Sequence, residues 1–215
     1  MYAEYEKGAD IVSFDIYPVN NTDSTTHGNL WYVAQGVDRL RQWSEYKKPV
    51  WNWIEVTGID SPSGAPTPAQ VKTEVWMSLV HGSMGVGYFC HVFSPTFIEA
   101  GLLADTAMKS AVQAINQQIH DLAPVLNTPS IANAATVSSS NSTVPVDLMV
   151  KRFGGTLYLF SVAMRRSATT ATFTVRGPPS ATVTVLGEAR TLSLSAGAFS
   201  DAFAPYAVHL YRVGP

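Results

Sequence analysis

Polar side chains stand near the ends of three apolar runs in the first half of the chain. Asp15 and Tyr17 close the run "DIVSFDIYP", and Glu55 closes the run "PVWNWIEV". His91 lies near the end of "GVGYFCHVF". A carboxylate at the end of such a run can act as a nucleophile or as an acid or base, and a neighbouring phenol can hold its charge by hydrogen bonding. Singly, each residue also fits an ordinary role as a turn cap, a rim aromatic or a core histidine, but together they predict a chemical site.

The segments between these runs have helical spacing of their apolar residues. Residues 28–48, 67–83 and 105–124 are predicted helices, and the second opens with Thr67 as N-cap and Pro68 in the first turn. Strands that alternate with helices predict a parallel sheet, as in a (β/α)8 barrel or a doubly wound fold. Barrel enzymes place their chemistry at the carboxyl ends of the strands, where the polar residues stand. No glycine-rich phosphate loop follows any of these runs, which argues against a nucleotide site.

The second half has a different texture. From residue 128 onward it is rich in Thr, Ser, Val and Ala, and short alternating runs are separated by Gly, Pro and Ser. This pattern predicts an antiparallel sandwich of about six to eight strands. Residues 126–145 are interpreted as the connection, with a Ser/Asn-rich loop. We therefore expect an α/β domain over residues 1–127 and an all-β sandwich over residues 128–215.

Composition excludes several classes of function. The formal net charge is −2 and charged residues make up 14% of the chain, so nothing favours binding to nucleic acid or to an anionic membrane. No apolar run reaches the roughly 18 residues of a membrane span, and no signal peptide is recognisable. The location is therefore left open, and a secreted parent enzyme is compatible with the sequence.

Metal and cofactor chemistry is not predicted either. The single cysteine, Cys90, cannot form an intrachain disulfide, and its apolar surroundings predict a buried structural thiol. The sequence has no C-x-x-C motif, and its five histidines are scattered. We expect no metal site and no cofactor.

Three segments together resemble a known group of enzymes. "ADIVSFDIYPV", "KPVWNWIEV" and "GVGYFCHVFSP" are similar to the last three strands of retaining glycoside hydrolase barrels, in the clan that includes cellulase-like and β-galactosidase-like enzymes. The segment "INQQIHDLAPVLNTP" resembles the closing helix and the exit toward a β-sandwich. The resemblance covers most of residues 1–129 and implies a partial (β/α)8 (TIM) barrel followed by the antiparallel sandwich.

The resemblance implies a role for each candidate residue. Glu55 matches the nucleophile at the end of the seventh strand of that clan. Asp15 and Tyr17 match the sixth strand, which lines the sugar cleft, and His91 matches the cleft wall beside the eighth.

The two indoles before Glu55 are expected to support the sugar. Trp51 and Trp53 alternate with Asn52 and Ile54, so they should point the same way as Glu55, into the barrel, and form the floor beneath a sugar. Tyr17 is expected to hold the Glu55 carboxylate ionised by hydrogen bonding.

The sequence departs from the family in its second carboxylate. Retention uses two carboxyls about 5 Å apart, and the clan's acid/base Glu usually follows an Asn. No Asn-Glu pair occurs in this chain, and strands one to five of the barrel have no counterpart. We therefore interpret the chain as the C-terminal part of such an enzyme, truncated, with open strand edges that predict a homo-oligomer burying the open barrel face.

Two classes of function stay open at this point. The first is glycosidase activity on an oligo- or polysaccharide, with Glu55 as nucleophile or as a remaining acid. The second is a non-catalytic carbohydrate-binding or structural remnant that keeps the cleft aromatics. An esterase is disfavoured, because "HGSMG" is not accompanied by a G-x-S-x-G elbow.

Overall fold

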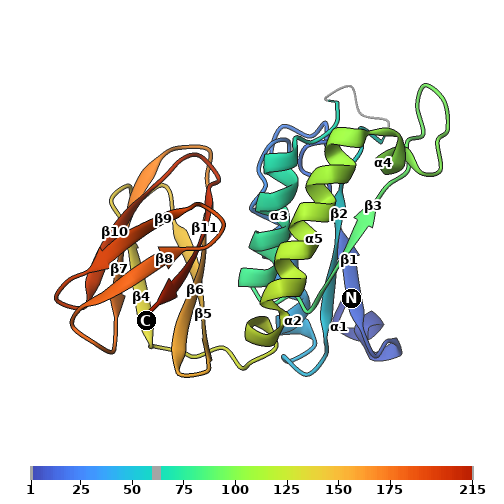
Figure 1. Ribbon diagram of the computed structural model, residues 1–215. Coiled ribbons are helices and arrows are strands. Elements are labelled where there is room, and N and C mark those ends of the chain that lie inside the picture. Colours follow the sequence, from blue (N-terminus) through green and yellow to red (C-terminus); the bar gives the residue numbers. More distant parts are fainter. Residues whose placement is uncertain (1, 60–63, 215) are drawn as a thin grey trace. The chain divides into compact units, whose positions relative to one another are not determined.

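The computed structural model describes residues 2–59 and 64–214 (Figure 1). The chain divides into two compact units, Met1–Ile115 and Asn116–Pro215. The division falls inside helix α5 (Thr106–Leu126), which carries the chain from one unit into the next. The sequence predicts a boundary after residue 127, just past the end of this helix.

The first unit contains a parallel sheet of three strands, as the strand–helix alternation predicts. Strands β1 (Val12–Asp15), β2 (Val50–Glu55) and β3 (Gly85–Phe89) lie in the order β1-β2-β3. Both pairings are parallel, with Asp15 opposite Trp53 and Glu55 opposite Phe89. Parallel strands bring their carboxyl ends to one edge of the sheet, so the predicted polar residues meet there.

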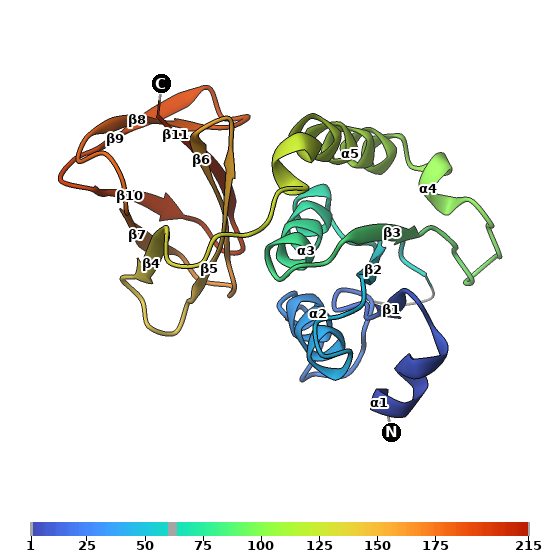
Figure 2. The same ribbon diagram turned by 90° about the horizontal axis from the view of Figure 1, so that it is seen from below.

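Helices α2 (Tyr32–Trp43) and α3 (Pro68–Val80) lie side by side along one face of this sheet (Figure 2). Helix α3 begins as predicted: the Thr67 side chain accepts from the Gln70 amide at 3.3 Å, and the Gln70 side chain accepts from the Thr67 amide at 2.8 Å. Helix α2 approaches the sheet closely because Gly36 leaves room for the Phe14 ring, which a Cβ there would overlap. Short helical turns complete the unit: α1 (Tyr2–Tyr5), η1 (Glu6–Gly8) and α4 (Gly101–Ala104).

The other face of the sheet carries two exposed indoles. Trp51 and Trp53 are 39% and 40% exposed, whereas Asn52 and Ile54, which alternate with them, are fully buried. A Cβ at Gly85 or Gly87 of the neighbouring strand would lie 2.5 Å from the Trp51 or the Trp53 ring. The two glycines of β3 thus let the indoles lie against its backbone. The expectation that Trp51 and Trp53 share a face is confirmed.

The second unit forms two antiparallel sheets. One has the order β10-β7-β4 and the other β5-β6-β11-β8-β9. The strands are β4 (Ala135–Ser139), β5 (Val146–Phe153), β6 (Thr156–Ala163), β7 (Thr169–Val175), β8 (Ala181–Val185), β9 (Arg190–Leu194), β10 (Ala198–Phe203) and β11 (Val208–Val213). Phe173, Phe199 and Tyr211 pack ring to ring in the core of this unit.

Two of these eight strands were not predicted as such. Strand β4 lies inside the segment interpreted as the connection, where small Ala, Thr and Ser residues hide the alternation; it pairs with β7 alone among the described residues. Strand β10 replaces a predicted turn. Its inward positions are Phe199, Asp201 and Phe203, and the acid interrupts the apolar pattern that would have revealed it.

None of the helices in the described part of the chain combines the length and the apolar character that crossing a membrane requires.

Candidate functional site

A cavity of about 400 Å³ lies at the carboxyl ends of the parallel strands. Four of the predicted site residues line it: Asp15, Tyr17, Trp53 and His91. These side chains come from all three strands or their extensions, which explains why they are far apart in sequence and close in space. Trp51 shares the exposed face of Trp53 but is not part of the cavity lining, and neither is Glu55.

Tyr17 links the polar side of the cavity to its aromatic side. The Asp15 carboxylate acts on its hydroxyl, and its ring packs at 5.2 Å from the Phe89 ring with a tilt of 46°. Burial, the hydrogen bond to Asp15 and the charges of Asp15 and Glu55 raise the pKa of Tyr17 above its usual range. Tyr17 is therefore a neutral phenol that is held in place.

His91 belongs to an aromatic cluster that extends beyond β3. Its ring meets the Phe89 ring edge-on at 5.3 Å and is nearly parallel to the Phe97 ring at 6.1 Å. Its backbone oxygen accepts a hydrogen bond from the Thr57 hydroxyl at 2.7 Å, which ties the ends of β2 and β3 together. The His91 Nδ1 atom is buried and has no hydrogen-bond partner among the described residues.

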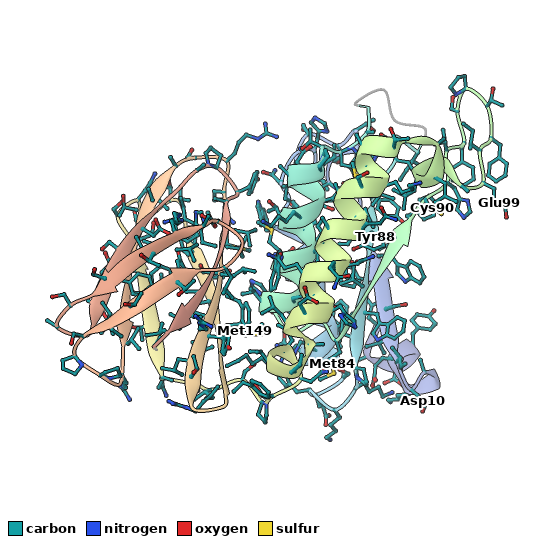
Figure 3. All side chains as sticks on the ribbon, viewed as in Figure 1. Asp10, Met84, Tyr88, Cys90, Glu99 and Met149 are labelled. Atoms are coloured by element: carbon teal, nitrogen blue, oxygen red, sulfur yellow. The ribbon has the colours of Figure 1, made fainter. Side chains whose placement is uncertain are left out.

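Cys90 also lines the cavity, so the expectation of a buried structural thiol is wrong. It is half-buried, and its Sγ lies 3.7 Å from the Glu99 backbone oxygen. Figure 3 shows Cys90 just beyond the end of β3, at the base of the loop that carries Glu99. The apolar sequence around Cys90 suggested burial, but β3 is only partly covered along its length.

Glu55 lies out of solvent, held by the loop that follows β1. Its carboxylate accepts hydrogen bonds from the Val19 amide at 2.6 Å, from the Asn20 amide at 2.8 Å and from the Asn20 side chain. The Asn20 side chain also donates to the Thr57 backbone oxygen at 2.9 Å. Glu55 has no exposed surface. The donors that hold it are thus Val19 and Asn20, and Tyr17, the predicted donor, is not among them.

The environment of Glu55 acts on its charge in two directions. Burial raises its pKa, and the hydrogen bonds from Val19 and Asn20 offset this only in part, so the pKa of Glu55 stays above its usual value. Trp51 and Trp53 are expected to point the same way as Glu55, yet the two indoles are partly exposed and Glu55 is fully buried. The cause is the loop after β1, which covers the end of β2.

A second buried acid, Glu74, was missed by sequence reasoning. It lies on α3 between Val71, Val75 and Ser78, at the spacing of the helix's buried face, and has no exposed surface. A charged residue at an apolar-face position is the signal that could have revealed it. Glu74 and Glu55 act on each other's pKa, so the acid that neighbours Glu55 comes from a helix.

No group of three or more metal-ligating side chains gathers in the part of the chain that the structure describes.

Sequence comparison gives no relative for this chain. No protein-family model matches it, and no curated protein matches it.

Solved structures, in contrast, show the fold. The α-amylase from Geobacillus thermoleovorans, complexed with acarbose, aligns with a TM-score of 0.61 and 8% identity over 100% of this chain and 50% of its own. A GH30 endoxylanase from Clostridium papyrosolvens aligns with a TM-score of 0.50 and 16% identity, over 97% of this chain and 49% of its own. A putative α-galactosidase from Bacteroides fragilis aligns with a TM-score of 0.50 and 17% identity, over 99% of this chain and 44% of its own.

The chain has a glycosidase-like fold. The structures it resembles are TIM-barrel glycosidases with C-terminal β domains. It spans about half the length of these neighbours: 50% of the α-amylase, 49% of the endoxylanase and 44% of the putative α-galactosidase. At identities this low the likeness concerns the fold.

Proposed function

We propose that this chain is a carbohydrate-active module of the glycoside hydrolase type, with a sugar bound in the cavity at the strand ends and Glu55 as the nucleophile. The observation that carries the proposal is the composition of that cavity: Asp15, Tyr17, Trp53 and His91 converge at the carboxyl ends of three parallel strands. Its volume of about 400 Å³ suits a small ligand.

The chemistry of the lining fits a neutral sugar. The partly exposed Trp53 indole offers a flat apolar surface for a pyranose ring. Asp15 is exposed and can accept hydrogen bonds from sugar hydroxyls. The neighbours include AmyP E221Q in complex with maltotriose and the α-amylase complexed with acarbose, which supports an oligosaccharide as the ligand.

The partial-barrel interpretation gives Glu55 its role in the proposal. We take β1, β2 and β3 as counterparts of the sixth, seventh and eighth strands of a (β/α)8 barrel, with the sandwich following. Glu55 then ends the seventh. Retaining hydrolysis also needs an acid/base about 5 Å from the nucleophile. No Asn-Glu pair supplies one in this sequence, and Asp15 is the carboxylate that lines the cavity.

A non-catalytic carbohydrate-binding role is the second candidate. The observation that favours it is the full burial of Glu55 beneath the loop at Val19 and Asn20. A nucleophile must reach the anomeric carbon, and in this arrangement the loop stands over the carboxylate. Binding in the cavity needs no movement of that loop.

Titration calorimetry with maltotriose and xylotriose tests sugar binding. Trp53→Ala should weaken binding at least tenfold if the indole carries the sugar ring. Trp51→Ala is the matched control, because this indole shares the face but lies outside the cavity lining. Equal binding by the wild type and Trp53→Ala, or no binding by the wild type, contradicts the proposed site.

Hydrolysis separates the two candidates. Para-nitrophenyl α- and β-glycosides of glucose, galactose and xylose are assayed with the wild type and with Glu55→Gln. Turnover that Glu55→Gln abolishes while trisaccharide binding persists supports the nucleophile. Binding without turnover in both proteins supports the non-catalytic role.

The open sheet face supports a proposal on assembly. Among the described residues, β1 and β3 each pair only with β2, and Met84, just before β3, is 75% exposed (Figure 3). We propose that a second copy of the chain covers the exposed face at Trp51, outside the cavity. Light scattering should show an oligomer, and Trp51→Lys should shift it to monomer. A monomeric wild type at high concentration contradicts the proposal.

A further inference from the structure

Glu74 is a buried acid that the proposed chemistry does not use. It lies in the middle of α3 with no exposed surface, and neither of its carboxyl oxygens receives a hydrogen bond from an N–H or hydroxyl donor of the described residues. An ionised carboxylate buried without a donor is among the least favourable arrangements in a protein interior. The structure therefore needs Glu74 to be neutral, which means protonated.

A protonated carboxyl has an O–H that must find an acceptor. Glu55 is the neighbouring carboxylate that acts on Glu74, and its oxygens can accept. The two acids differ in what else they contact: Glu55 accepts from two backbone amides and one side-chain amide, and Glu74 accepts from none. Three N–H donors stabilise a negative charge on Glu55 and leave the proton on Glu74.

We propose that Glu74 is a positioning residue that stays protonated and donates its carboxyl O–H to Glu55, so that the two acids share one proton and carry one negative charge. Glu55 then accepts hydrogen bonds from two segments: from Val19 and Asn20 in the loop after β1, and from Glu74 on α3. The arrangement fixes both the rotamer and the charge of Glu55.

The electrostatics of the surroundings agree with this assignment. Burial, followed by the charge of Glu55 and the hydrogen bond to it, raises the pKa of Glu74 well above its usual value. Glu55 is the one charged group that acts on Glu74 among the described residues. From the β1 side, the titratable group on which the charge of Glu55 acts is Tyr17, which is neutral. Among the described residues no cation acts on the pair, so the proton on Glu74 is hard to remove.

The consequence for chemistry rests on the proposed function. A nucleophile must be ionised, and a buried acid beside it that keeps its own proton leaves Glu55 as the charged member. If Glu55 forms a covalent bond to a sugar, its charge disappears and the hydrogen bond from Glu74 weakens; hydrolysis restores both. The shared proton itself is a property of the free protein and can be tested without a sugar.

The pH dependence of unfolding tests the shared proton. The folded state holds a proton on Glu74 that the unfolded chain releases above the usual glutamate pKa, so stability falls as the pH rises toward the folded pKa. From about pH 6 to about pH 8, the unfolding constant of the wild type should rise by up to about tenfold per pH unit. Tryptophan fluorescence follows the first unit alone, because all five Trp lie before residue 77.

Three variants give the pattern that a merely structural residue would not produce. Glu74→Gln keeps a donor for Glu55 but has no proton to lose, so the unfolding constant should become nearly independent of pH over this range. Glu74→Leu also removes the pH dependence but leaves Glu55 without that donor, so it should be less stable than Glu74→Gln. Glu99→Gln, at an exposed position, should keep the wild-type slope.

A slope in Glu74→Gln equal to that of the wild type overturns the proposal. If Glu74→Gln does not fold, the infrared spectrum of the wild type at about pH 7 decides: a protonated carboxyl band that Glu55→Gln shifts supports the pair, and its absence contradicts it. A protein that binds no sugar but shows this pH dependence refutes the proposed function and leaves the shared proton intact.

Discussion

A cluster of polar side chains in the first unit and one in the second differ in how their charges are balanced. In the first unit Glu55 and Glu74 bring two acids together with no cation. In the second, the Asp201 carboxylate accepts hydrogen bonds from both terminal nitrogens of Arg190, at 2.9 and 2.8 Å. It also accepts one from the Tyr211 hydroxyl at 2.9 Å. Glu188 completes that network, accepting from Arg190 at 2.8 Å.

The difference shows how buried polar groups that stabilise the fold can be told from buried polar groups that destabilise it and so indicate a functional site. Burial alone would raise the pKa of Asp201, yet hydrogen bonds from Arg190 and Tyr211 more than offset it, and the pKa lies below its usual value. Every charge there has a partner, so the network contributes to stability as it stands. The pair of acids lacks a cation and raises the free energy of the fold, which is typical of functional sites.

The largest effect is expected from removing the acid of the network. Asp201→Ala leaves the Arg190 guanidinium and the buried Tyr211 hydroxyl without their acceptor, and should lower the free energy of unfolding by about 3 kcal/mol. Circular dichroism in urea measures this loss. Tryptophan fluorescence should keep its midpoint, because the second unit has no Trp; a shift of that midpoint would mean that the two units unfold together.

The next effect concerns the donors of the acid pair. Asn20→Ala removes one hydrogen bond to the Glu55 charge and one to the Thr57 backbone. The free energy of unfolding of the first unit should fall by about 2 kcal/mol, because bonds to charged groups are strong. Fluorescence-monitored unfolding measures it, with Asn29→Ala, at an exposed side chain, as control. An unchanged stability would mean that the backbone amides of Val19 and Asn20 hold Glu55 alone.

The two clusters should respond to pH with opposite signs. Asp201 has a lowered pKa, so its contribution is present above the usual aspartate pKa and is lost as the pH falls through the folded value. Glu74 has a raised pKa, so stability is lost as the pH rises. Asp201→Asn should flatten the acid side of the stability curve, and Glu74→Gln the other side, each by up to about 1.4 kcal/mol per pH unit. Curves that both variants flatten on the same side would contradict the comparison.

The smallest effect is expected from a single hydrogen bond inside the network. Tyr211→Phe removes the hydroxyl that donates to Asp201, while Asp201 keeps both bonds from Arg190. The loss should be about 1 kcal/mol, as for a typical buried hydrogen bond. Urea unfolding followed by circular dichroism measures it, with Tyr158→Phe as the matched substitution. A loss as large as that of Asp201→Ala would mean that the Tyr211 hydrogen bond, and not the ion pair, supplies most of the stability that the network contributes.

Sequence patterns predicted the elements that have a simple period. The alternation in "PVWNWIEV", the helical spacing before and after it and the cap at Thr67 depend on neighbours a few residues apart, and all three are found. Strand β10 was not predicted, because its inward-facing Asp201 interrupts the apolar alternation. The partner of that acid, Arg190, lies eleven residues earlier, beyond the range of a local sequence pattern.

What the sequence by itself determined is the set of polar residues at the strand ends, because the carboxyl ends of parallel strands share one edge. Asp15, Tyr17, Trp53 and His91 do meet there. What only the tertiary structure decided is the environment of Glu55. The loop at Val19 and Asn20 covers it, and Glu74 approaches it from helix α3. Burial and protonation depend on contacts between segments distant in sequence, and those contacts exist only once the chain has folded.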